Sequence, residues 1–268
     1  MSDYFQFLLW PFLASLILVG IHTYFGLHVI KRGIIFIDLS LAQVAAFGVT
    51  IAMLLGYETD SVASYLFALS FALTGGVIFT FTKDLKSKVP QEAIIGIVYA
   101  VSSAAAILVV SHSPEGAEHI RYLLVGSLLT VSPSVVLKTA GIYALVGAFH
   151  WFARDKFIPL TFDSEKKLAN PKFWDFLFYA SFAVVVTSSV KICGVLLVFI
   201  FLVVTSVFAA MVTEKISMRL LYGWIFGFFG SAIGIMLSFW FDTPTGATIV
   251  CTFGIILLLA SLVKKLLR

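Results

Sequence analysis

The sequence predicts an all-α polytopic membrane protein with about eight to nine transmembrane helices and one short re-entrant or interfacial helix. The 268 residues are 60% hydrophobic and only 12% charged, and the mean hydropathy is +1.05. No soluble globular class combines these values at this length. The 19 glycines fit a chain whose helices approach one another closely in lipid.

Nine apolar windows of the length that spans a bilayer follow one another along the chain. They lie at residues 7–30, 34–56, 62–82, 92–111, 134–153, 174–190, 194–212, 219–240 and 247–263. The stretch from His119 to Val131 is apolar but too short to cross. We interpret it as an interfacial or re-entrant helix, with an extension of the fifth span as the alternative. Residues 1–268 are expected to form a single transmembrane domain.

The basic residues predict the orientation in the membrane. If Lys31 and Arg32 are cytoplasmic and the spans alternate, most of the 18 basic residues fall on the same side, and the opposite loops carry acidic residues. Cytoplasmic loops carry the excess of Lys and Arg. We therefore expect the N-terminus outside and the C-terminus in the cytoplasm.

The longest polar segment runs from Arg154 to Lys172, and this topology places it in the cytoplasm. Asp163-Ser164 has the pattern of a helix start, and Asn170-Pro171 that of a stop. The segment is either an inert connector or a docking site for a cytoplasmic partner. No GxxxxGK[ST] pattern for nucleotide binding occurs in the chain. Transport powered by ATP would therefore need a separate ATPase subunit.

The second apolar window carries four polar residues, Asp38, Ser40, Gln43 and Thr50. A carboxylate at membrane depth costs roughly 2.5–3.5 kcal/mol, which makes Asp38 a candidate for function. On an ideal helix Ser40, Gln43 and Thr50 share a face within about 80°, whereas Asp38 and Gln43 lie about 140° apart. We expect these residues to line a translocation path. Hydrogen bonding between helices, about 0.6 kcal/mol per contact, is the alternative.

A second group of candidate ligands lies in the predicted outer loop SHSPEGAEH, with His112, Glu115, Glu118 and His119. Imidazole and carboxylate groups at an entrance could receive a metal such as zinc; a solvated loop is the alternative. The sequence has no nucleophile paired with a base, so we expect no catalytic site. No basic stripe with interleaved aromatic residues indicates nucleic-acid binding.

Six stretches in order resemble the membrane permease subunit of bacterial ABC importers for divalent transition metals, the zinc/manganese/iron permease family. They are Pro11 to Gly56, PQEAIIGIVYA at 90–100, LLVGSLLTVS at 123–132, LTFDSEKKLA at 160–169, VKICGVLLVFIFLVVTSVFAA at 190–210 and FDTPTGATIV at 241–250. The second resembles the entry to the family's fourth span, the third its short glycine-containing helix, and the fourth its cytoplasmic coupling helix.

This resemblance implies a type II importer-like permease in the bacterial inner membrane, present as a homodimer. It implies a cytoplasmic dimer of ABC ATPases that hold ATP, an extracytoplasmic solute-binding protein, and zinc, manganese or iron as the transported ion, with no cofactor bound by this chain. The ATPase would couple through residues 154–173. The coupling residues would be Thr161, Phe162, Asp163, Ser164, Glu165 and Leu168.

The chain departs from the family at the metal motif. The family's second span typically carries DALSHA, with Asp and His on one helical face. Without a gap these two positions fall on Leu39 and Gln43, and after a shift on Asp38 and Ala42. Neither register restores the pair. Three alternatives therefore stay open: a permease for a metal chelate such as a siderophore or cobalamin, a secondary transporter driven by an ion gradient, and a membrane scaffold that transports nothing.

Overall fold

The structure is a computed structural model that describes residues 2–59, 61–83, 89–111, 126, 128–163 and 168–266, with side chains from residue 8 onward. No strand occurs in these ranges. The elements are α1 (Ser2–Arg32), α2 (Ile37–Leu54), α3 (Val62–Thr82), α4 (Gln91–Val110), the short 3-10 helix η2 (Leu128–Thr130), α6 (Pro133–Phe152), α7 (Arg154–Phe162), α8 (Pro171–Val212), α9 (Ile216–Phe241) and α10 (Thr245–Leu266). Of the described helices, 8 are long and apolar enough to cross a membrane.

The apolar windows predict these helices well. The third window matches α3 residue for residue, and most of the others differ from their helices by a few residues at each end. The windows at 174–190 and 194–212 both fall within α8, whose 42 residues are interrupted by non-helical backbone at Gly194, with φ 76° and ψ 165°. A positive φ of this size suits glycine, which has no Cβ. In the described part of 119–131, η2 is separated from α6 by two non-helical residues, Val131 and Ser132.

The helix predicted to start at Asp163-Ser164 falls largely on residues 164–167, which lie outside the described residues; the structure describes the segment that leads up to Asp163. A helix ends there: Asp163 caps the C-terminus of α7, and its backbone N–H donates to the carbonyl oxygen of Pro159. Pro159 lies inside α7, a position where proline normally breaks a helix, and this is why the sequence pattern did not predict a helix before Asp163. Pro171 is the first residue of α8, a position to which proline is well suited.

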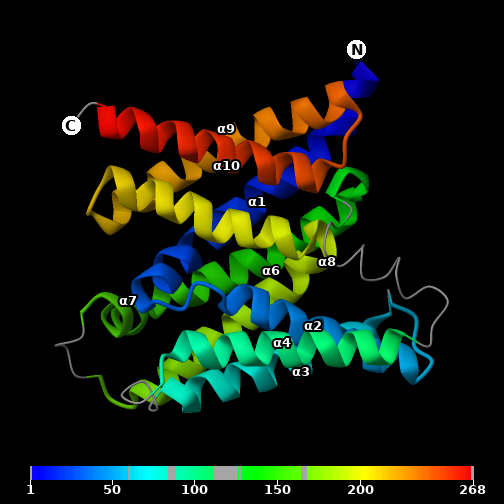
Figure 1. Ribbon diagram of the computed structural model, residues 1–268, viewed down its shortest axis with the longest axis vertical. Coiled ribbons are helices and arrows are strands. Elements are labelled where there is room, and N and C mark those ends of the chain that lie inside the picture. The colour runs from blue at the N-terminus through cyan, green and yellow to red at the C-terminus, as the bar shows by residue number, and fades with distance from the viewer. Residues whose placement is uncertain are drawn as a thin grey trace. The chain divides into compact units, whose positions relative to one another are not determined.

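The chain divides into two compact units, each made of separate segments. Unit 1 comprises residues 1–30, 124–143 and 191–268, and unit 2 comprises residues 31–123 and 144–190. In unit 2, α2, α3 and α4 lie side by side (Figure 1). Gly48 of α2 allows α3 to approach closely, since a Cβ at this position would lie 2.7 Å from the carbonyl oxygen of Phe67.

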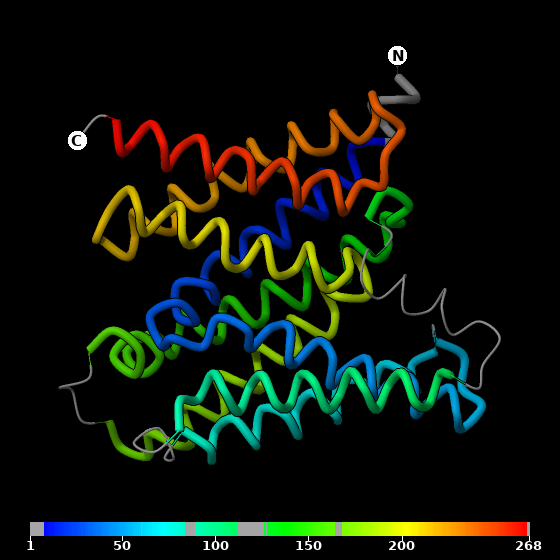
Figure 2. Tube along the Cα trace, viewed as in Figure 1, coloured from blue at the N-terminus to red at the C-terminus, as the bar shows by residue number. Residues whose placement is uncertain are grey.

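In unit 1, α9 and α10 run side by side, as the orange and red segments of Figure 2 show. The helix α9 packs through a row of glycines. Gly223 and Gly227 face side chains of α1, and Gly230 and Gly234 face side chains of α10. Small residues of this kind let helices in lipid approach closely enough for their backbones to pack.

Candidate functional site

Asp38 is a buried carboxylate in the first turn of α2, with 1% of its surface exposed. Neither of its carboxylate oxygens has a hydrogen-bond partner among the described residues. A helix N-terminus favours negative charge, but buried charges are otherwise paired or bound to a metal. The sequence allowed Asp38 to reach the membrane surface from its place near a charged helix end. The structure instead encloses it.

The other three predicted residues of α2 have different surroundings. Ser40 is fully buried, and its hydroxyl has no hydrogen-bond partner within the described chain. The Thr50 hydroxyl donates to the carbonyl oxygen of Phe47 at 2.7 Å, one turn earlier on the same helix. Gln43 is half-buried. Asp38 and Ser40 therefore have polar atoms that a passing solute could satisfy, whereas Thr50 is satisfied by its own helix.

Glu92 of α4 joins Asp38 at the start of α2. Its Oε1 accepts a hydrogen bond from the backbone N–H of Phe36 at 3.0 Å, which caps α2. Its Oε2 is buried without a partner in the described part of the chain. In the sequence, Glu92 is simply an acidic residue in the first turn of its own helix, α4. Its second role, as the acceptor for the start of α2, depends on the packing of α4 against α2.

Among the described residues of unit 2, three buried carboxylate oxygens thus lack a hydrogen bond, both on Asp38 and one on Glu92, and the Ser40 hydroxyl lies on the same helix as Asp38. Buried carboxylate oxygens that lack a hydrogen bond can be satisfied by a cation. Oxygen ligands of this kind suit manganese, magnesium or calcium better than soft metals. No group of three His, Cys, Asp or Glu side chains able to hold a metal ion occurs among the described residues.

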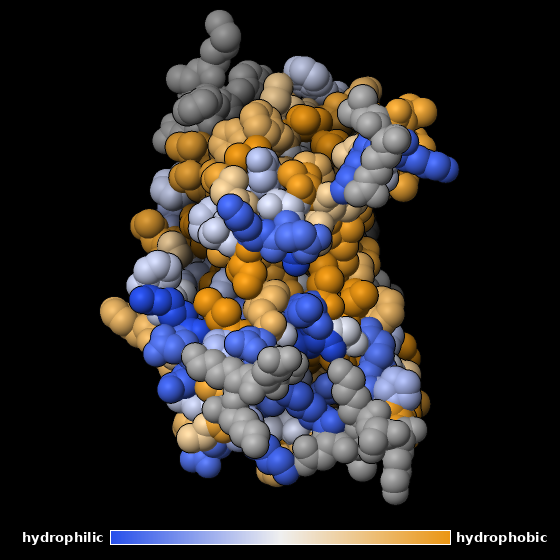
Figure 3. Space-filling model, turned by 90° about the vertical axis from the view of Figure 1, so that its left-hand side faces the viewer, coloured by the Kyte–Doolittle hydropathy of each residue, from blue (hydrophilic) through white to orange (hydrophobic). Residues whose placement is uncertain are grey.

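The other candidate residues are only partly visible. His112, Glu115, Glu118 and His119, and also Ser164 and Glu165, lie outside the described residues. Of the remaining coupling residues, Thr161 and Phe162 form the last turn of α7, and Asp163 and Leu168 follow it. This helix lies at the end of unit 2 that faces the viewer in Figure 3, where hydrophilic side chains gather between hydrophobic ones.

A second buried charged group, which the sequence analysis did not identify, lies where several elements of unit 2 meet. Asp175 of α8 accepts hydrogen bonds from Arg32 Nη1 at 2.8 Å and from Lys83 Nζ at 2.5 Å. The side chains of Arg32 and Asp175 are 7% and 5% exposed, and that of Lys83 is 35% exposed. We refer to these three residues as the Asp175 cluster. The signal in the sequence was an acidic residue at the start of an apolar window.

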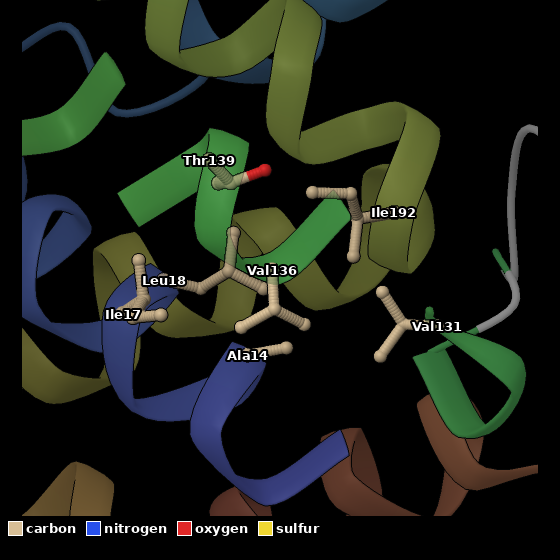
Figure 4. A pocket seen from close by; sticks show the side chains of 7 residues that line it. All are labelled: Ala14, Ile17, Leu18, Val131, Val136, Thr139 and Ile192. Atoms are coloured by element: carbon tan, nitrogen blue, oxygen red, sulfur yellow. The ribbon is translucent and has the colours of Figure 1, made fainter. Parts of the chain in front are cut away.

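Two hollows among the described residues, one in each unit, are lined mainly by apolar side chains. In unit 1, a narrow apolar gap lies among Ala14, Ile17, Leu18, Val131, Val136, Thr139 and Ile192 and has no room for a water molecule (Figure 4). In unit 2, a groove of about 500 Å³ between α2, α3 and α4 is lined by apolar side chains and by the uncharged Thr74 and Ser102. Empty apolar cavities stay dry. The unpaired oxygens of Asp38 and Glu92 therefore remain the candidate site for a cation.

Curated relatives match nearly the whole chain. It is 24% identical over 240 residues to the manganese transport system membrane protein MntC of Listeria monocytogenes, covering 88% of this chain and 83% of that protein. It is also 24% identical over 249 residues to a Haemophilus influenzae protein named as a probable iron transport system membrane protein, covering 92% and 89%.

Two solved structures share the fold. One is PsaBC from Streptococcus pneumoniae in complex with Fab, with a TM-score of 0.79 and 19% identity over 96% of this chain and 93% of that one. The other is a metal-chelate type ABC transporter in an inward-facing conformation, with a TM-score of 0.69 and 18% identity over 95% and 85%. The model of the ABC 3 transport family matches residues 4–264. The chain is therefore a multi-pass membrane protein that belongs to the ABC 3 transport family.

Proposed function

We propose that this chain is the permease subunit of an ABC importer for a divalent transition metal. The observation that carries the proposal is the set of buried, unpaired oxygens on Asp38 and Glu92. Buried carboxylate oxygens that find no hydrogen bond destabilise a fold. A cation that passes the unpaired oxygens of Asp38 and Glu92 would satisfy them. The names of the relatives, which refer to manganese, iron and metal transport, support the same conclusion.

The donor atoms favour manganese over zinc as the transported ion. Asp38, Ser40 and Glu92 offer oxygen, and the histidine that would accompany the aspartate in the family motif is replaced by Gln43 or Ala42, depending on the register. Carboxylate, hydroxyl and amide oxygens suit manganese, whereas zinc prefers nitrogen and sulfur in addition. In this proposal Asp38 and Glu92 contact the ion directly, and Ser40, Gln43 and Thr50 line the path beside them.

The proposal extends to the assembly that the family resemblance implies. Two copies of the chain, each a single transmembrane domain, lie in the bacterial inner membrane with N-termini outside and C-termini in the cytoplasm. A dimer of ATPases binds residues 154–173, through residues that include Phe162, Asp163, Ser164, Glu165 and Leu168. A solute-binding protein delivers the metal outside, where His112, Glu115, Glu118 and His119 receive it. ATP is hydrolysed on the partner, and this chain performs no catalysis.

The experiment that tests the proposal is uptake by liposomes that contain the chain with its ATPase and its binding protein. Manganese, zinc and iron are each supplied, and their contents inside the liposomes are measured by elemental mass analysis, with ATP and with a non-hydrolysable analogue. We expect ATP-dependent uptake with manganese ahead of zinc. An assembled complex that hydrolyses ATP but accumulates none of the three ions would contradict the metal assignment and favour a metal chelate as the substrate.

A further inference from the structure

The helix α7, which leads directly into the proposed ATPase-binding segment, is held at its middle by an aromatic cluster. Phe157 is fully buried. Its ring stacks on His150 of α6, with ring centroids 4.1 Å apart, and meets the Trp174 ring of α8 edge-on at 5.6 Å. The His150 Nε2 is in turn hydrogen-bonded to the Ser181 hydroxyl of α8 at 2.7 Å. This packing fixes the centre of α7 against the end of α6 and the start of α8.

The last turn of α7 is held by a second, polar contact. Arg32 Nε donates a hydrogen bond to the Thr161 hydroxyl at 3.0 Å. The same guanidinium group donates from Nη1 to Asp175 and lies 4.0 Å above the Phe178 ring of α8. Because a guanidinium group is planar and rigid, its donors keep a fixed geometry. The position of Thr161 relative to α8 is therefore set by the Arg32 side chain.

We propose that Arg32 is a positioning residue that couples α7 mechanically to the membrane spans. This inference rests on the proposed function. When the partner ATPase moves the segment after Asp163, α7 cannot turn or slide separately, because Phe157 and Thr161 attach it at two points. The movement is passed through Arg32 to Asp175 and so to α8, and along α1, whose last residue is Arg32. Thr161 thus acts inside the chain, as the acceptor for Arg32, instead of contacting the ATPase.

The burial of the contact between Arg32 and Asp175 supports this assignment. The side chains of Arg32 and Asp175 are almost completely removed from solvent, and a charged hydrogen bond in such surroundings is stronger and better defined than one on a surface. Lys83 at the end of α3 binds the other oxygen of Asp175. The ends of α1 and α3 and the start of α8 are therefore joined at one carboxylate, next to α7.

The test compares Thr161→Val with Thr161→Ser in the complete complex of permease, ATPase and binding protein. Valine has nearly the shape of threonine but cannot accept the hydrogen bond from Arg32, whereas serine keeps the hydroxyl. The readout is the number of manganese ions imported for each ATP hydrolysed, together with co-purification of the ATPase. Hydrogen exchange of the backbone amides in the last turn of α7 is measured on the same samples.

For Thr161→Val we expect normal ATPase binding and faster hydrogen exchange at the end of α7. We also expect roughly fivefold fewer ions imported per ATP, because the loss of one hydrogen bond typically changes a population by about that factor. Thr161→Ser should behave as the unmodified chain. Unchanged ions per ATP in Thr161→Val overturns the positioning role, and so does loss of ATPase binding, which would make Thr161 a docking residue. Failure of the unmodified complex to import any metal would instead refute the proposed function.

Discussion

Asp38 and Asp175 are both buried carboxylates of unit 2, and they differ in whether their oxygens have hydrogen-bond partners. Asp175 has two cationic partners within hydrogen-bond distance. Asp38 has no hydrogen-bond partner in the described part of the chain. A buried charge is tolerated when it is paired and is costly when it is not. At the scale of single residues, Asp175 is therefore paired within the fold, whereas Asp38 keeps an unsatisfied carboxylate, to which the proposed function gives a role in transport.

Replacing Asp38 with asparagine should raise stability and lower transport together. The change removes an unpaired buried charge, which we expect to stabilise the fold by about 1–3 kcal/mol, and it weakens the attraction for a divalent cation. Thermal unfolding in detergent and liposome uptake measure the two effects. Asp242→Asn is the matched control, because Asp242 is exposed and its left-handed backbone suits asparagine. Unchanged uptake in Asp38→Asn would give Asp38 a purely structural role.

Replacing Asp175 with asparagine should destabilise the protein strongly. The buried Arg32 would lose its charged partner, and breaking a buried ion pair in this way typically costs about 3–5 kcal/mol. Glu214→Gln provides the control, since Glu214 pairs with Arg219 but its side chain is 95% exposed, and exposed pairs are worth about 0–1 kcal/mol. Thermal unfolding of both variants should show a much larger loss of stability in Asp175→Asn than in Glu214→Gln. Equal losses of stability would show that burial does not strengthen the Asp175 cluster.

At the scale of elements, α1 approaches the second half of α8 closely at Gly26 in unit 1. A Cβ on Gly26 would lie 2.0 Å from the carbonyl oxygen of Leu202 and 2.3 Å from the Ser206 hydroxyl oxygen. The backbone atoms there cannot move aside without shifting a helix. The Ser206 hydroxyl also donates to the carbonyl oxygen of Thr23 at 3.1 Å, which joins the two helices one turn away.

A pair of alanine substitutions on α1 tests this packing. Gly26→Ala should lower stability by about 1–3 kcal/mol, the usual cost of overpacking. Gly20→Ala is on the same helix, and nothing lies within 4 Å of the added Cβ. It should raise stability by about 0.5–1 kcal/mol, because alanine favours helix more than glycine does. Thermal unfolding midpoints provide the comparison, and two equal shifts would argue against a tight contact at Gly26.

The elements also show what could be predicted from sequence alone. Long apolar windows predict the spanning helices because a helix in lipid must satisfy its own backbone. Interactions between helices were not predicted. Glu92 reaches the start of α2, and Arg32 reaches Asp175, across many residues of sequence, and no local pattern encodes such distances. Around Asp163 the local signals favoured a helix start, but the buried Phe157 stabilises a helix that ends there despite Pro159.

At the scale of the whole molecule, the proposed function makes transport depend on an ATPase that binds the segment after α7. Replacing Phe162 to Leu168 with a Gly/Ser linker should detach or uncouple the ATPase without unfolding the spans, because those residues lie outside the spanning helices. Co-purification with the ATPase, metal uptake and thermal unfolding measure the three consequences. Intact ATPase binding and uptake in the linker variant would contradict a coupling role for this segment.

The interruption of α8 at Gly194 has a consequence for the biogenesis of the protein. An unbroken helix of its length would be about 63 Å long, about twice the hydrocarbon thickness of a bilayer. The two apolar windows within it are separated by only 191–193, so the ribosome delivers them with no hydrophilic loop between. The insertion machinery therefore receives the two windows in immediate succession. A chain released after the first window would lack residues 191–268, the longest segment of unit 1.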